Sequence, residues 1–515
     1  MGRLRGSRRR PKGEVVTSPT DLANLSRCEW RAAQDLRAKR GEIAAPAQVA
    51  DPQAALLGAR GERHERATRD RYELLPGVDV VEIATGDMAA AAADTRRAMD
   101  AGAGVIYQAA LVSRDGRRHG YADFLVRVET ASDLGGWSYE PVDAKLAMTA
   151  KEHHWLQVAE YGDLLTDVQG CRPGRLHVIT GDGVRQTRAA TDVAAAHQEA
   201  ASRLTGILGG DVPSSPEPCD LCAVCRWAPD CRRRWEDEGH LSIVGVHRPT
   251  RAKLAEVEVT RIADLAAADP GDLAEKTGMA LETIDRAVAR ALLHQRATAA
   301  DAPLVEVVDP AALEALTPPG SADRFLDFET DIGPDGQERF YLLGSCDSER
   351  AYRAVWAHTR EEERKLLEGA LHEIEGALDA GGRVYHYNHF ERSAMVRLAE
   401  RHDPSLLPKV EAVFANPNVV DLLPVVRNGI RTSLRSNGLK AIETLYAPEL
   451  RSGHDTHGAA AAAFDYERFS LTGDPDALER IAAYNEADVV ALVHLLAWLR
   501  SLVDPTQVNG SVIRD

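Results

Sequence analysis

The chain has 515 residues, of which 44% are hydrophobic and 27% charged, and its formal net charge is −17 at pH 7. This length exceeds one ordinary hydrophobic core and, at about 150 residues per domain, predicts three units. The acidic balance argues against a general nucleic-acid coat protein, because nonspecific phosphate binding needs surplus Lys and Arg. It does not exclude a nuclease, since such enzymes carry acidic metal sites and can hold the strand with local basic patches.

The N-terminus, "MGRLRGSRRRPKG", is basic and has no apolar segment behind it, so it does not look like a secretory signal. No uninterrupted run of 18 apolar residues follows, and we therefore expect a soluble, cytoplasmic protein without membrane contact. A second basic cluster, "CRRRW", begins at Cys231. Both clusters are either solvated surface or patches that hold a nucleic-acid strand.

Residues 14–239 mix helical and strand-like patterns. The stretch "SPTDLANLSRCEWRAAQDLRAKR" has helical periodicity behind a Ser N-cap, whereas "HGYADFLVRVET" and "SYEPVDAKLA" have the pattern of strands. Residues 240–304 predict short amphipathic helices separated by turns, which is typical of a helix-hairpin-helix-like connector. In residues 305–505, "RFLDFET", "RFYLLGSC" and "AYRAVWA" predict three successive strands, followed by a long helix and a strand at "GRVYHYN". The fold class is therefore α/β and multidomain.

Four of the seven cysteines lie in the stretch "CDLCAVCRWAPDC". In a reducing compartment, such a cluster usually binds a metal. Cys222, Cys225 and Cys231 supply three thiolates, and the distant Cys28 could supply the fourth. The alternative is a zinc site made from the four clustered cysteines alone, which includes Cys219 and closes without Cys28.

The residues between Cys28 and the cysteine cluster include candidates for a catalytic metal site. In chain order these are His64 in "GERHE", Asp123 in "GYAD", Asp143 and Lys145 in "PVDAKLA", and Gln157 and Tyr161 in "QVAEY". Asp143 and Lys145 share one strand face, and the last pair lies one helical turn apart on one face. Carboxylates bind Mg²⁺ or Mn²⁺, and a histidine partner favours Mn²⁺. Taken singly, each residue is more typical of solvated surface or of helix packing.

The order of these motifs resembles the PD-(D/E)XK nuclease fold, in which Gly-x-x-Asp, Asp-x-Lys and Gln-x-x-x-Tyr follow one another. Three clustered cysteines with a fourth far upstream are similar to those of the iron–sulfur nucleases of the RecB/AddB type and the CRISPR-adaptation exonucleases. The resemblance implies a [4Fe-4S] cluster that ties the two ends of the domain together, with ligands Cys28, Cys222, Cys225 and Cys231. It implies that Asp123, Asp143 and His64 hold the catalytic metal and that Lys145 stabilises developing charge. Cys219 is surplus to this pattern.

A second group of acids lies in the C-terminal part of the sequence. Asp327 and Glu329 alternate with apolar residues in "FLDFET" and so point the same way from one strand. Two carboxylates on one face repel each other unless a cation neutralises them. Glu391 follows a strand in "VYHYNHFERSAM", and Tyr484 and Asp488 share one helical face in "AAYNEADVVAL". For "DFET" alone, the alternative is a pair of acids on an exposed strand.

Asp-x-Glu, then Asn-x-x-acid, then Tyr-x-x-x-Asp resembles the DEDDy 3′–5′ exonuclease branch of the RNase H-like fold, and more specifically the YprB-type domain. The resemblance implies a two-metal site in which Tyr484 orients the attacking water, held by the acids Asp327, Glu329, Glu391 and Asp488. Glu391 departs from the superfamily, which usually has Asp here, so metal spacing or activity could differ. We expect Asp421 to cap a strand or helix end, and "SLRSNGLKAIETLY" to be a helix without ligands.

The whole arrangement resembles RecB-like nucleases in which a PD-(D/E)XK iron–sulfur module precedes an RNase H-like module. It implies a metal-dependent nuclease acting on DNA, or on RNA, at single strands or ends, in repair, processing or defence. In that family a helicase often follows, whereas this sequence ends at "VNGSVIRD"; a stand-alone form, a fragment and a helicase acting in trans all stay open. The rival hypothesis is a nucleic-acid-binding adaptor with decayed sites, which the retention of the named acids and Lys145 disfavours.

Overall fold

The computed structural model describes residues 15–47, 52–213, 215–333, 336–450, 458–504 and 512–513. By its internal contacts the chain divides into two compact units. The first comprises residues 1–232 with 334–337, and the second comprises residues 233–333 with 338–515. The helical connector predicted over residues 240–304 belongs to the second unit, and the division into three domains stays a prediction.

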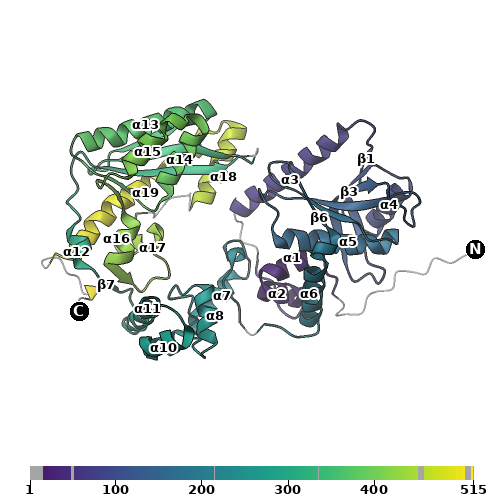
Figure 1. The fold of residues 1–515 in the computed structure, drawn as a ribbon, viewed down its shortest axis with the longest axis horizontal. Coiled ribbons are helices and arrows are strands. Elements are labelled where there is room, and N and C mark those ends of the chain that lie inside the picture. The colour runs from purple at the N-terminus through teal and green to yellow at the C-terminus, as the bar shows by residue number, and fades with distance from the viewer. Residues whose placement is uncertain are drawn as a thin grey trace, which may run out of the picture. The chain divides into compact units, whose positions relative to one another are not determined.

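A six-stranded sheet, ordered β1-β2-β3-β4-β5-β6, forms the centre of the first unit (Figure 1). Its strands are β1 Val80–Glu82, β2 Val105–Val112, β3 His119–Val128, β4 Ser138–Ala144, β5 Arg175–Ile179 and β6 Arg185–Ala189. β2, β3 and β4 are antiparallel neighbours, whereas β5 runs parallel to β4. The strands predicted in "HGYADFLVRVET" and "SYEPVDAKLA" are confirmed as β3 and β4. Their pairing places the two aspartate motifs on adjacent strands.

Helices pack against this sheet and flank it. They are α1 Pro19–Arg27, α2 Glu29–Lys39, α3 Pro52–Glu73, α4 Met88–Asp100, α5 Glu152–Gln169 and α6 Ala190–Leu208. A 3-10 turn at Asp220–Ala223 and α7 Ala228–Asp237 follow in the chain, and the boundary between the two units falls within α7. Met99 of α4 and Leu164 of α5 are buried in one cluster with Ile106 of β2. The helix predicted behind the Ser18 N-cap is confirmed, but the extended backbone at Cys28 divides it into α1 and α2.

After α7, the second unit continues with a group of helices. They are α8 Arg248–Ala255, α9 Ile262–Ala267, α10 Pro270–Thr277 and α11 Leu281–Ala300. Their apolar side chains form a separate core around Leu254, Leu265 and Ile284. Gly278 ends α10 with a φ of 63°, a left-handed conformation that glycine adopts without strain. The helical pattern predicted for this segment is therefore confirmed.

A sheet with the order β10-β9-β8-β11-β12 organises the rest of the second unit (Figure 1). Its strands are β8 Arg324–Ile332, β9 Glu338–Cys346, β10 Tyr352–Trp356, β11 Val384–His386 and β12 Val419–Asp421. β8, β9 and β10 form an antiparallel meander, and β11 runs parallel to both β8 and β12. The predicted sequence of three strands, a helix and a further strand is confirmed. A smaller sheet contains β7 Val305–Val307, β13 Ile430–Thr432 and β14 Val512–Ile513.

Helices pack on both faces of the larger sheet. They are α12 Pro310–Glu314, α13 Arg360–Asp379, α14 Phe390–His402, α15 Leu407–Phe414, α16 Leu422–Gly429, α17 Leu439–Glu443, α18 Ala459–Thr472 and α19 Pro475–Ser501, with a 3-10 turn at Pro404–Leu406. Phe328 of β8 is buried in the cluster that α13 and α14 form, whereas Phe325 is buried with Leu492 of α19. Because side chains alternate along a strand, Asp327 and Glu329 share the face of Phe325, toward α19.

Among the described helices, α19 is long and apolar enough to cross a membrane, and 67% of its most apolar 18-residue window is buried inside the protein. Its residues Leu495 and Leu496 lie in the same core as Phe325. A buried core helix meets the same criterion of length and composition. The predicted lack of membrane contact therefore stays a prediction.

Candidate metal centres

Three carboxylates meet between β8 and α19. Asp327 and Glu329 come from alternate positions of β8, and Asp488 comes from α19. Each offers one oxygen, and these oxygens all lie within 4.8 Å of one another. Glu329 is 4% exposed and Asp488 is 7% exposed, so little water screens their charges. Oxygen ligands at this spacing could hold a divalent ion, the chemistry that the sequence predicts for these three residues.

The charges in this group favour a bound cation. Burial, followed by the charges of Asp488 and Glu329, raises the pKa of Asp327 well above its ordinary range. Lys440 acts in the opposite direction and offsets only part of this rise. Largely buried carboxylates repel one another unless protons or a cation neutralise them. The group therefore gains from a proton or a metal ion.

Asn485 of α19 holds two of the acids in place. Its Nδ2 donates to Asp327 Oδ2 at 2.8 Å and to Glu329 Oε1 at 3.4 Å, and its Oδ1 accepts from the Tyr352 hydroxyl at 3.0 Å. Gly344 lies opposite Asp327 in the sheet, and a Cβ there would lie 1.5 Å from Asn485 Oδ1. Neither Asn485 nor Gly344 is among the residues that the sequence predicts for the site. The sequence feature that could have revealed Asn485 is its place in "YNEAD", between the predicted site residues Tyr484 and Asp488.

Tyr484 lies beside Lys440, a residue that the sequence does not predict as part of the site. The hydroxyl of Tyr484, a 4% exposed residue, accepts a hydrogen bond from Lys440 Nζ. The same ammonium lies 4.2 Å from the centroid of the tyrosine ring, within the range of a cation–π contact. Lys440 belongs to α17, so the helix predicted in "SLRSNGLKAIETLY" is confirmed. That helix nevertheless carries a charged residue into the site.

Glu391 lies outside the group of three carboxylates. It is 3% exposed and lies in the first turn of α14, and its Oε2 is 3.2 Å from Nδ1 of His386. Burial raises the pKa of Glu391, and the neighbouring His386 partly offsets the rise. Its role as a fourth ligand stays a prediction. Asp421 caps α16, because its Oδ1 accepts from the backbone of Leu423 at 2.9 Å, so the predicted cap is confirmed.

A family comparison assigns the fold around these carboxylates. Residues 324–500 match the RNase H superfamily. They form an RNase H-like domain. The match begins at the first residue of β8 and ends within α19, so it contains every acid described above. A search of curated proteins finds no match to this chain.

A second set of charged side chains lies at the centre of the first unit's sheet, outside the RNase H-like domain. The backbone N–H of Ala144 donates to Asp123 Oδ2 at 2.8 Å, which links β4 to β3. Asp143 is 1% exposed, and its Oδ2 lies 2.6 Å from Lys145 Nζ. Its Oδ1 has no hydrogen-bond partner among the residues that the structure describes. The folded chain thus brings together the acids of "GYAD" and "VDAK" with a lysine.

Lys145 neutralises part of the negative charge of Asp123 and Asp143 in the first unit. Burial, followed by the charge of Asp143, raises the pKa of Asp123 well above its ordinary range, and Lys145 partly offsets the rise. Burial lowers the pKa of Lys145, but the charges of Asp143 and Asp123 outweigh it and raise the pKa overall. Lys145 therefore stays charged beside the two acids.

The other residues predicted for this site lie on α5 and α3. The Tyr161 hydroxyl of α5 donates to the backbone carbonyl of Tyr121 at 2.6 Å. Burial and the charge of Asp143 raise the pKa of Tyr161, and a hydrogen bond from Gln157 acts against the rise. His64 Nε2 lies 3.4 Å from the backbone carbonyl of Ile179. The catalytic roles of these residues stay predictions.

Five cysteines gather at one end of the first unit. Cys28 caps α2, and a hydrogen bond with Cys219 lowers its pKa, against burial and the charges of Cys222 and Cys225. The sulfurs of Cys219 and Cys222 are 3.9 Å apart. Burial, followed by the charges of Cys225 and Cys222, raises the pKa of Cys231 to about 12. Cys219, which is surplus to the predicted ligand set, thus lies beside Cys222 and Cys28, and the ligand roles of these cysteines stay predictions.

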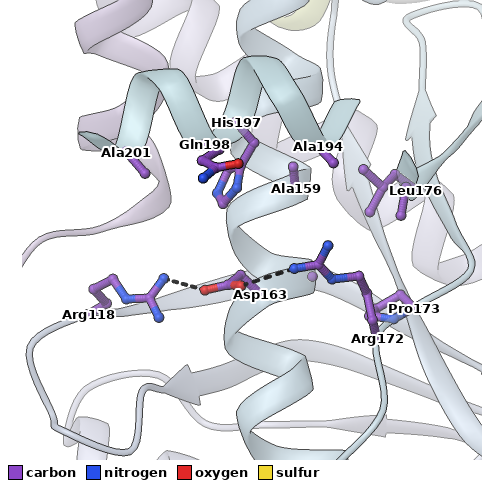
Figure 2. Close-up of a pocket in the computed structure, with 12 residues that line it drawn as sticks. Arg118, Ala159, Asp163, Arg172, Pro173, Leu176, Ala194, His197, Gln198 and Ala201 are labelled. Atoms are coloured by element: carbon purple, nitrogen blue, oxygen red, sulfur yellow. Dashed lines mark hydrogen bonds and ion pairs between the residues drawn. The ribbon is translucent and has the colours of Figure 1, made fainter. Parts of the chain in front are cut away.

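A cavity of about 420 Å³ is lined by residues of α5 and α6, among them Asp163 and His197 (Figure 2). Arg118 lines it, and its Nη1 lies 3.0 Å from Glu160 Oε1 and 2.6 Å from Asp163 Oδ2. His197 Nε2 lies 2.6 Å from Glu160. The charged groups around this cavity pair with one another, so they are not arranged around a missing charge. We assign no ligand to it.

Proposed function

We propose that this chain is a divalent-metal-dependent nuclease that hydrolyses phosphodiester bonds in DNA. The observation that carries the proposal is the group of three carboxylate oxygens within 4.8 Å of one another inside an RNase H-like domain. A bound Mg²⁺ or Mn²⁺ ion would polarise the scissile phosphate and acidify the attacking water. A need to bind this metal ion would account for a fold that holds three mutually repelling carboxylates together.

The chain's own groups would divide this work. Asp327, Glu329 and Asp488 would hold the metal, and the Asn485 amide would keep the first two carboxylates oriented through its hydrogen bonds to them. Lys440 can only donate a hydrogen bond, so the Tyr484 oxygen accepts from it and the tyrosine proton must point elsewhere. Tyr484 would in this way orient the water or the phosphate.

In the first unit we propose a second nuclease site of the PD-(D/E)XK type. Asp123 and Asp143 would bind the metal, with His64 as a further ligand. Lys145, at 2.6 Å from Asp143, would turn to the developing negative charge on the phosphate. The support is the convergence of Asp123, Asp143 and Lys145, in the order that the sequence resemblance implies.

We further propose that Cys28, Cys222, Cys225 and Cys231 hold a [4Fe-4S] cluster. The donor set fits, because it joins a thiol near the start of the first unit's sequence, Cys28, with thiols near its end, such as Cys231. Among the described residues, the only ligand atoms found in a group of three or more within 4.8 Å are carboxylates. The sulfurs of Cys219 and Cys222, 3.9 Å apart, have the spacing of a tetrahedral zinc site with Zn–S bonds of about 2.3 Å, so zinc stays the alternative that metal analysis must exclude.

Iron analysis of anaerobically purified protein tests the cluster. Cys28→Ala should lose iron and destabilise the first unit, because the ligand that clasps the two ends is removed. Cys171→Ala, a cysteine outside the group, is the matched control and should keep its iron. Stoichiometric zinc without iron would refute the cluster. Iron loss in Cys219→Ala but not in Cys28→Ala would refute the ligand assignment.

The proposed partners are a DNA single strand or end, with RNA as the alternative substrate, and a helicase that acts in trans in the cytoplasm. Cleavage of end-labelled single- and double-stranded DNA and RNA by the full chain, with Mg²⁺ and with Mn²⁺, tests the activity. Asp327→Ala and Asp143→Ala should each remove part of the cleavage, and the double variant should remove all of it. Binding without cleavage by the wild type, under all these conditions, would favour an adaptor instead.

A further inference from the structure

The backbone of β2 is strained at one residue. Gln108 has a φ of 56°, a left-handed value that a non-glycine side chain rarely adopts inside a strand. The register with β3 pairs Tyr107 with Phe124 and Ala109 with Ala122, so Gln108 lies opposite Asp123. Strain of this kind persists only where surrounding contacts compensate for it, and it concentrates at functional sites.

The strained backbone lets two consecutive side chains reach the same carboxylate. In a regular strand, neighbouring side chains point to opposite faces. Here Gln108 Nε2 donates to Glu65 Oε1. Burial raises the pKa of Tyr107 to about 12, with added contributions from the charge of Glu65 and a hydrogen bond to it. Glu65, on α3, is therefore held by two residues of β2.

Gln108, which donates to Glu65, lies opposite Asp123, so this carboxylate lies near the acids of the first unit. The charge of Glu65 contributes to the raised pKa of Asp123, after burial and Asp143, and it adds to the charges that raise the pKa of Lys145. Asp143 is 1% exposed, and its Oδ1 has no hydrogen-bond partner among the described residues. A buried carboxylate oxygen without a donor, beside two further acids, is arranged for a cation.

We propose that Glu65 is a third metal-facing carboxylate of this site and that Tyr107 and Gln108 are positioning residues that hold it there. The inference rests on the proposed nuclease function of the first unit. It extends the site that the sequence predicts, which includes His64 but not the neighbouring Glu65. Three oxygen donors suit Mg²⁺ and Mn²⁺.

Calorimetric titration of the full chain with Mn²⁺ tests Glu65. All variants carry Asp327→Asn, so that the site in the RNase H-like domain is weakened and the first unit dominates the binding. Glu65→Gln should weaken Mn²⁺ binding about tenfold or more. Glu62→Gln, an exposed glutamate on the same helix that pairs with Arg66, is the matched control and should bind as the parent does.

Two substitutions of Gln108 separate positioning from folding. Gln108→Ala and Gln108→Gly both remove the donor, so both should weaken Mn²⁺ binding. The glycine variant should melt at a higher temperature than the alanine variant, because glycine adopts a φ of 56° without strain. If affinity instead followed melting temperature, so that the glycine variant bound like the parent, Gln108 would be structural and its positioning role would fail.

The outcomes distinguish this inference from the proposed function. If the Asp327→Asn parent binds Mn²⁺ and cleaves DNA but Glu65→Gln binds equally well, only the assignment of Glu65 is wrong. If the parent neither binds Mn²⁺ nor cleaves, the proposed function of the first unit fails, and the role of Glu65 fails with it. A selective loss of affinity in Glu65→Gln and in both Gln108 variants supports the whole proposal.

Discussion

The two candidate metal centres use a lysine in different ways. In the first unit, Lys145 Nζ lies 2.6 Å from Asp143 Oδ2, so a cation of the chain already occupies one side of a carboxylate that would bind metal. In the RNase H-like domain, Lys440 donates to the Tyr484 hydroxyl and the neutral Asn485 holds the acids. The first site is therefore partly neutralised by its own chain, whereas the second depends more on protons or a bound ion.

This difference has consequences for metal binding. A metal in the first unit must compete with Lys145 for Asp143, or bind through its Oδ1, which has no hydrogen-bond partner in the described part of the chain. In the RNase H-like domain, a metal instead relieves repulsion that the fold leaves in place. We therefore expect tighter metal binding, and a stronger dependence of stability on pH and metal, in the RNase H-like domain.

The largest effect should come from Asp327→Ala, measured with Asp143→Ala present to silence the first unit. Losing a carboxylate that holds the metal removes several kcal/mol of transition-state stabilisation, so cleavage should fall by about 10³-fold. Timed digestion of end-labelled DNA in Mn²⁺ measures the rate. Asp379→Ala, an exposed acid at the end of α13, should cleave at the parent rate. Robust digestion by the Asp327→Ala protein would leave this domain a binding relic.

Lys145→Met should separate catalysis from metal binding in the first unit. With Asp327→Ala present, it should slow cleavage by about 10²-fold, because a charge that stabilises the transition state is lost. Calorimetric titration should at the same time show tighter Mn²⁺ binding, since the competing ammonium is gone. The exposed Lys151→Met is the control. Weaker Mn²⁺ binding in Lys145→Met would contradict the competition.

Much of this architecture follows from local periodicity. The alternation in "FLDFET" correctly places Asp327 and Glu329 on one strand face, and "QVAEY" correctly places its polar pair on one helix. Cys28 shows where local reasoning stops. The helical pattern runs through it, yet the backbone is extended there, which ends α1 and turns the sulfur toward Arg31 N and the other thiols.

The residues that sequence reasoning missed act through contacts between distant segments. Lys440 matters because α17 brings it to Tyr484, and Asn485 matters because Gly344 leaves room for it. Gln108 gave no signal either, since its role comes from a backbone angle that no periodicity reveals. Cys219, which the predicted ligand set leaves out, lies 3.9 Å, sulfur to sulfur, from Cys222, a contact that the spacing of the cysteines does not reveal.

A smaller effect is expected where Lys440 meets Tyr484. Lys440→Met and Tyr484→Phe should each slow cleavage by the RNase H-like domain about tenfold, because each disturbs the orientation of the tyrosine hydroxyl. The double variant should be little slower than either single one, since both act through one hydrogen bond. Lys409→Met removes an ion pair with Glu375 on the same domain and is the control. Additive losses would show that the two residues act independently.

The smallest effect is a difference in how metal-free stability depends on pH. The pKa of Asp327 is raised in the folded protein, by burial and then by Asp488 and Glu329. Below an ordinary carboxyl pKa of about 3.9, both folded and unfolded chains hold this proton. As the pH rises, the unfolded chain releases it first, and the folded state loses about 1.4 kcal/mol for each unit up to the raised pKa.

Urea unfolding in EDTA between pH 5 and pH 8 measures this slope. Asp327→Asn should flatten the dependence of stability on pH, and replacing the EDTA with Mn²⁺ should do the same in the parent. Asp123→Asn should flatten it less, because Lys145 offsets part of the rise in the pKa of Asp123. Equal flattening by the two substitutions would contradict the view that the first unit carries its own counter-charge. A larger effect at Asp123 would reverse the comparison, since the more strongly repelling acids would then lie in the first unit.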